Sequence, residues 1–226
     1  WAWGLFKFGN DWLNEGIYVA TALMLNTLVK GWVASESSRQ LAEDRRMGTL
    51  ELLLSTPLTV PDILTGQRLA LQRQFFGPLL VILGAEFLMW TAGSDSTGGS
   101  ASEWSSLWMV GTLMVLADLV ALYWVGMWQG LSARNPKHAF SGAVMRVLVL
   151  PWIAFGAFVM FMALSPHSGR DLGWEGFLGT WFVLGLVTDL GFGLHARQKL
   201  LTEFRLAATQ RYQPRASLWK RLLTGR

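Results

Sequence analysis

The sequence predicts an all-α protein, a polytopic bundle of about five transmembrane helices with one short amphipathic helix between the first two spans. Two features of composition lead to this fold class. Of the 226 residues, 52% are hydrophobic and only 15% are charged, whereas soluble domains average about 25% charged residues. The apolar residues gather into stretches of membrane-spanning length, and 13 tryptophans accompany them. We therefore predict a single transmembrane domain over residues 1–226.

Five stretches come close to the roughly 20 apolar residues that a helix needs to cross a bilayer. The first contains Asn26 and Lys30 and is the weakest, whereas the third and fourth are long and strongly apolar. The polar sequence AGSDSTGGSASE, rich in Gly and Ser, separates the second span from the third. The predicted spans are about 16–33, 75–91, 106–131, 139–164 and 176–194.

Positive charges predict the orientation, because Lys and Arg concentrate in cytoplasmic loops. Sixteen of the 19 Lys and Arg residues fall in three segments, 30–74, 132–138 and 197–226. We therefore expect a multi-pass protein of the cytoplasmic (inner) membrane, with these segments and the C-terminus in the cytoplasm and Trp1 outside. Five spans with an external N-terminus further suggest a truncated six-span unit. Four tryptophans near the outer ends are typical of an aromatic belt: Trp90, Trp104, Trp108 and Trp174.

Several classes of site are excluded by the residues present. The chain has no cysteine, so it forms neither disulfides nor thiolate metal sites, and its three histidines lack the spacing of metal ligands. No Gly-Lys pair occurs anywhere, which rules out a phosphate-binding loop of the G-x-x-x-x-G-K-[ST] type. We expect no bound cofactor and no catalytic activity on this chain. The basic tail beside apolar spans favours membrane lipid over nucleic acid as its partner.

Segment 35–74 carries an element that mixes charges with leucines, EDRRMGTLELLLSTPL. We predict two short helices that meet at Gly48, because glycine tolerates backbone conformations that other residues resist. The second of these helices is amphipathic, with Glu51 away from its apolar face. The leucines that share the apolar face are Leu50, Leu53 and Leu54.

A proline exit and a fresh helix start follow the leucines. Thr56 precedes Pro57, which disfavours continuation of the helix. Thr59 is placed as an N-cap, and Asp62 is placed to return the capping bond. The new helix is expected to run into the second span.

The stretch AEDRRMGTLELLLSTPLTVPDILTGQ, residues 42–67, resembles the cytoplasmic signature of type-2 ABC export permeases. In that family an acidic-basic pair, a Gly-Thr, a leucine run and a proline precede a helix that returns to the membrane. One departure is Gln67, where the family commonly has lysine. The matching positions are Glu43, Arg46, Gly48, Thr49, Leu50, Glu51, Leu52, Leu53, Pro57, Ile63, Leu64 and Gly66.

The resemblance implies a permease subunit that forms half of an ATP-driven export pathway. Its expected partners are a separate ABC ATPase, which binds the ATP, and a second permease copy or a homologous half. Segment 43–66 would be the coupling element, with its leucines in a cleft of the ATPase. Without that partner, the segment would be an interfacial helix on lipid headgroups. The coupling residues implied are Glu43, Arg46, Gly48, Thr49, Leu50, Glu51, Leu53, Leu54 and Pro57.

Four ionisable residues fall within the predicted spans, where each costs roughly 2.5–3.5 kcal/mol at mid-span unless it is paired or hydrated. Arg146 and Asp189 lie about 10 Å and 8 Å from the cytoplasmic ends of their spans, so we predict a structural pair. Asp118 lies near mid-span without a partner at its depth, which leaves structural and transport roles equally open. Glu86 lies nearer the outer face.

Three other classes of membrane protein compete with the permease interpretation. Asp118 and Asp189 could form the dyad of an intramembrane aspartyl protease, but LVTDLGFG lacks the sequence context of that class. A secondary transporter or channel would show repeat symmetry and broken helices around a midplane site, and the sequence has neither. A structural membrane protein without an ATPase partner remains the third alternative.

Overall fold

The computed structural model describes residues 1–9, 14–94, 101–133, 136–164 and 173–209. These residues are almost entirely helical and include no strand, which confirms the all-α prediction. The predicted loops at 95–100 and 165–172 and the tail from residue 210 lie outside the described residues. The elements are α1 (Ala2–Phe8), α2 (Glu15–Met47), α3 (Thr49–Leu54), α4 (Val60–Ser94), α5 (Ala101–Ser132), α6 (Pro136–Val144), the π-helical turn η2 (Met145–Val149), α7 (Leu150–Leu164) and α8 (Trp174–Thr209).

Five helical segments are long and apolar enough to cross a membrane, and each contains one of the five predicted spans. Helices α2 and α4, with 33 and 35 residues, are each about 50 Å long. The hydrocarbon core of a bilayer is only about 30 Å thick, so both helices are long enough to project beyond it. The chain thus has the architecture of a multi-pass membrane protein.

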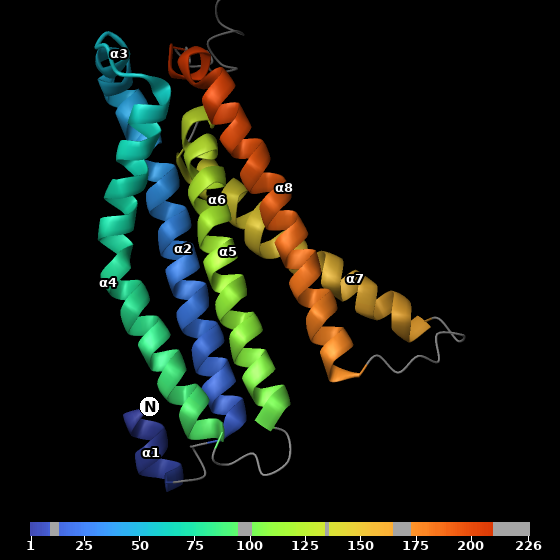
Figure 1. The fold of residues 1–226 in the computed structure, drawn as a ribbon. Coiled ribbons are helices and arrows are strands. Elements are labelled where there is room, and N and C mark those ends of the chain that lie inside the picture. Colours follow the sequence, from blue (N-terminus) through green and yellow to red (C-terminus); the bar gives the residue numbers. More distant parts are fainter. Residues whose placement is uncertain (10–13, 95–100, 134–135, 165–172, 210–226) are drawn as a thin grey trace, which may run out of the picture.

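Figure 1 shows α2, α4 and α5 running side by side, with α8 leaning away from them along its length. Helix α5 is central and packs against both α2 and α8. The short α3 lies at one end of the bundle with the end of α2 and the start of α4, and α1 lies at the opposite end (Figure 1). We call the end that holds α3 the basic end, after Arg45, Arg46, Arg68 and Arg197.

Two glycines allow α2 and α5 to approach closely. A Cβ atom at Gly130 would lie 2.2 Å from the Ser38 carbonyl oxygen, and one at Gly126 would lie 2.0 Å from the Ser37 hydroxyl oxygen. The Ser37 hydroxyl also donates to the carbonyl oxygen of Leu122, at 3.2 Å. Small residues four apart on one helix, with a hydroxyl bond across the interface, are a common way to associate helices in membranes.

Two segments differ from their predicted helices. The first of the two short helices expected around Gly48 is not separate, because α2 continues without a break to Met47. The fourth span is not one regular helix either, since the π-helical turn η2 divides it into α6 and α7. Extra residues in a helical turn redirect the axis, and Pro151 is the second residue after this turn. Helix α7 projects away from α5 (Figure 1).

The tryptophans at the end opposite α3 are only partly an aromatic belt. Trp104 and Trp108 are buried in a cluster with Tyr18, and the Trp104 indole donates to the carbonyl oxygen of Trp90 at 2.9 Å. Trp174 is exposed, as expected for a belt residue. The belt prediction is therefore wrong for Trp104 and Trp108, whose rings fill the space between α2, α4 and α5.

Candidate functional site

The turn between α2 and α3 forms at Gly48. Its φ of 77° and ψ of 5° place it in the left-handed region, which favours glycine over residues with a side chain. Its backbone N–H donates to the carbonyl oxygen of Arg45 at 3.3 Å, and this closes α2. Thr49, half-buried, then begins α3. The predicted break at Gly48 is confirmed.

The leucine face of α3 is turned into the protein. Leu50 has 0% of its surface exposed and belongs to a core cluster with Leu41, Ile63 and Phe204, from α2, α4 and α8. Leu53 and Leu54 are half-buried against the same cluster. The prediction that these leucines enter a cleft of another protein is therefore wrong for Leu50, because burial among the chain's own helices already removes its side chain from water.

The opposite edge of α3 is open. Met47 and Leu52 are each 71% exposed, and Glu51 and Pro57 are exposed beside them. Apolar side chains with this much exposure at the end of a bundle are typical of a contact surface. The sequence pattern therefore predicted the partner contact on the wrong side of α3. An apolar pattern identifies the face of a helix that is buried, but it does not say whether that face packs against the same chain or against a partner.

The start of α4 carries the predicted capping interaction. The backbone N–H of Thr59 donates to the Asp62 carboxylate at 3.0 Å, and the Thr59 hydroxyl donates to the same oxygen. Asp62 lies in the first turn of α4, well before the apolar stretch that begins near residue 75. The hydrogen bonds from the Thr59 hydroxyl and backbone N–H hold the pKa of this carboxyl below its usual range. These bonds fix the point at which the connection from α3 enters α4.

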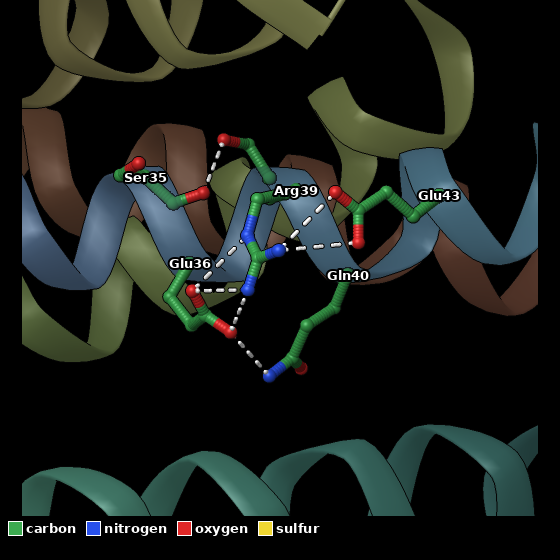
Figure 2. Close-up of polar contacts among 6 residues, drawn as sticks. Ser35, Glu36, Arg39, Gln40 and Glu43 are labelled. Carbon is green, nitrogen blue, oxygen red and sulfur yellow. Dashed lines mark hydrogen bonds and ion pairs between the residues drawn. The ribbon is translucent and has the colours of Figure 1, made fainter.

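Charged side chains line the end of α2 (Figure 2). Arg39 donates to Glu36 at 3.0 Å and to Glu43 at 3.2 Å, and Gln40 donates to Glu36 at 3.1 Å. Glu43, expected to face a partner, is thus engaged by a residue of its own helix. Arg46, one turn further on, is exposed.

Gln67 makes a contact that joins α4 to α2. Its side-chain amide donates to the Asp44 carboxylate at 3.2 Å, and both side chains are half-buried. Burial raises the pKa of the Asp44 carboxyl, and the bond from Gln67 opposes this rise. Gln67, where the resembled family commonly has lysine, therefore contacts an acidic side chain through a neutral amide.

Three ionisable side chains meet between α2, α5 and α8. Lys30 forms an ion pair with Asp118, and Asp189 lies close enough to interact with both. Asp118 and Asp189 are each only 3% exposed, and neither carboxylate oxygen of Asp189 has a hydrogen-bond donor among the described residues. The prediction that Asp118 lacks a partner is therefore wrong, because Lys30, which lies near the end of the first predicted span, reaches it.

Of the other two intramembrane charges, Glu86 lies near Lys30, whereas Arg146 is separate from this group. Glu86 is buried on α4, near the side chains of Asn26 and Lys30 on α2. Arg146 is exposed on η2, and its guanidinium donates to the Gly142 carbonyl oxygen at 3.4 Å. The predicted pair between Arg146 and Asp189 is therefore wrong. The two residues were matched by their depth in the membrane, and depth does not determine which faces of two helices are in contact.

The fold and these two regions define a multi-pass helical membrane protein with a braced turn at its basic end and a charged group inside its bundle. Within the described part of the chain, no three acidic or histidine side chains come together as metal ligands would. Comparison of the chain with protein-family models, with curated proteins and with solved structures gives no match. The indications of its function therefore lie in this geometry and in residues 42–67.

Proposed function

We propose that this chain is the membrane-spanning permease subunit of an ATP-driven exporter. It would move a substrate across the cytoplasmic membrane and be coupled to a separate ABC ATPase through residues 43–66. The observation that carries the proposal is α3 itself, a short helix between the first two spans. One side of it is buried in the bundle through Leu50, and the other side exposes Leu52. The resemblance of residues 42–67 to type-2 ABC export permeases supplies the class of partner.

The bracing of α3 supports a mechanical role. Gly48 connects it to α2 with no intervening loop, and Leu50 anchors it among residues of α2, α4 and α8. The Thr59 and Asp62 cap begins α4 five residues after α3 ends. Because tightly packed elements transmit displacement rather than absorb it, a push on α3 would move the spans behind it.

The contact surface for the ATPase is revised by the burial of the leucines. We assign the contact to the open edge around Met47, Glu51 and Leu52, with Pro57 at its end. Arg46, exposed beside this edge, would set register and association rate, as charges at an interface rim commonly do. Leu50, Leu53 and Leu54 hold α3 in place. ATP binding and hydrolysis would belong to the partner, and a second permease copy or a homologous half would complete the pathway.

The test replaces one exposed leucine with aspartate and measures recovery of the ATPase. Full-length tagged protein is purified in mild detergent from its native cells, and co-purifying ATP-hydrolysing subunits are quantified. We expect Leu52→Asp to lose most of the ATPase and most transport-stimulated ATP hydrolysis, because a charge without a partner would be buried at the contact. The matched control is Leu206→Asp, the same change at an exposed position of α8.

The interfacial alternative gives a different result. If the open edge of α3 only rests on lipid headgroups, Leu52→Asp and Leu206→Asp would recover equal amounts of any ATPase at equal expression. Equal recovery would overturn the coupling assignment. Leu50→Asp serves as a folding reference, since it places a charge in a fully buried site and should lower the yield of folded protein irrespective of the partner.

A further inference from the structure

A groove of about 1080 Å³ opens between α4, α5 and α8. Ligand-binding pockets commonly have volumes of about 300–1,000 Å³, so the groove could hold a sizeable molecule. Its wall is mostly aliphatic and aromatic, and three arginines, Arg68, Arg73 and Arg197, stand in it. None of the described residues that line it is acidic, so the groove carries a positive charge.

In the groove, the charged residues and the apolar residues lie at different depths in the membrane. Arg73 lies two residues before the apolar stretch of α4 near 75–91, and Arg197 lies three residues after that of α8 near 176–194. These arginines therefore stand at the level of lipid headgroups. Helix α4 leads away from the basic end and α5 leads toward it (Figure 1). Later residues of α4 and earlier residues of α5 therefore lie closer to the middle of the bundle. Phe76, Leu79, Leu116 and Val120 form this deeper part.

The three groove arginines form no ion pair with any described residue. The guanidinium carbon of Arg197 lies 5.6 Å from the centre of the Trp124 ring, which lines the same groove. The ion pairs among the described residues use Lys30, Arg39 and Lys199 as cations, and none uses a groove arginine. Phe76 and Val120 are 65% and 61% exposed, so the described residues leave the apolar wall uncovered as well.

We propose that this groove binds an anionic phospholipid of the cytoplasmic leaflet. The lipid phosphate would lie between Arg73 and Arg197, with Arg68 one to two turns further out, and an acyl chain would run along Phe76 and Val120. Guanidinium groups bind phosphate oxygens through paired, charge-assisted hydrogen bonds. Basic pockets between membrane helices on the cytoplasmic side recognise anionic headgroups by this chemistry. The proposal does not depend on an ATPase partner.

The test is native mass spectrometry of the full-length protein titrated with phosphatidylglycerol and, in parallel, with phosphatidylcholine of identical acyl chains. The wild type is expected to bind phosphatidylglycerol more tightly. Arg73→Gln and Arg197→Gln are each expected to weaken phosphatidylglycerol binding about fivefold. The loss for phosphatidylcholine should be smaller, because its phosphate can make the same contact but its choline cation offsets the charge. Arg205→Gln is the matched control, since it removes the same charge from an exposed position of α8 outside the groove.

A second variant tests the acyl part of the groove. Val120→Trp fills the deeper wall, so it should weaken both lipids about equally. Equal effects of Arg197→Gln and Arg205→Gln would overturn the proposal, because charge alone would then explain the binding. Displacement of phosphatidylglycerol by millimolar inorganic phosphate would overturn it in favour of a free-anion site. Loss of a dimer in Val120→Trp without a change in lipid binding would overturn it in favour of a second copy on this face.

Discussion

Lys30 supplies the positive charge that the buried carboxyl groups of α5 and α8 face. It pairs with Asp118, and Asp189 lies beside both without a hydrogen-bond donor among the described residues. Charges inside an apolar medium are expensive when isolated and much less so when paired. The pair therefore joins α2 to α5, and Asp189 adds a second carboxyl to a site that holds one ammonium group.

The two aspartates are predicted to respond differently to neutralisation. Asp118→Asn breaks the ion pair with the half-buried Lys30. Breaking a buried pair by removing one partner typically costs about 3–5 kcal/mol of stability. Asp189→Asn replaces a carboxyl that no described side chain donates to with an amide of similar shape that can still donate to Asp118, so its cost should be much smaller. Unfolding of the purified protein in a detergent titration measures both. Lys30→Met combined with Asp118→Asn should recover part of the loss, and equal losses for the two single variants would contradict the assignment.

At the scale of elements, the close contact between α2 and α5 depends on glycines, which have no side chain to separate the two backbones. Gly126 and Gly130 place the backbone of α5 against Ser37 and Ser38 of α2. The Gly-x-x-x-Gly spacing is visible in the sequence, in GMWQG, and is the signal that could have indicated this contact. Charged residues and apolar runs do not reveal this contact.

Gly130→Ala is predicted to destabilise the protein by about 1–3 kcal/mol, as overpacking in a tight interface does. The added methyl group would meet the carbonyl of Ser38, which is backbone and cannot rotate away. Gly111→Ala is the control on the same helix, because nothing lies within 4 Å of its added Cβ atom. Detergent-titration unfolding should show the loss for Gly130→Ala alone, and similar curves for both variants would argue against close packing.

At the scale of the whole molecule, the ends of the bundle differ in charge. Arg45, Arg46, Arg68 and Arg197 stand at the end that holds α3. This distribution follows the rule that positive residues remain on the cytoplasmic side. Helix α1 lies at the other end (Figure 1). The charges therefore predict that α3 faces the cytoplasm.

The topology is measurable with single cysteines, since the chain has none of its own. Ser102 and Ser55 are exposed at opposite ends of the bundle. With a membrane-impermeant maleimide, Ser102→Cys should be labelled in intact spheroplasts, and Ser55→Cys only after the membrane is opened. The converse pattern would reverse the orientation and remove the cytoplasmic placement of α3.

Local signals in the sequence were enough for the elements of this fold. Apolar stretches of spanning length predicted all five long helices, Gly48 predicted the turn after α2, and Thr59 with Asp62 predicted the start of α4. Each of these depends on residues close together in the chain, whose hydrogen bonds and apolar runs act over one or a few turns. The same holds for the short helix α3.

The tertiary structure alone decided which side chains meet. It buried Leu50 under α8 and left Leu52 outside, it paired Asp118 with Lys30 and not Asp189 with Arg146, and it turned Trp104 inward. All of these depend on the rotation of each helix about its own axis and on which helices pack against it. In a bilayer, apolar faces are satisfied by lipid as well as by protein, so apolar periodicity alone does not say which face of a helix packs inward.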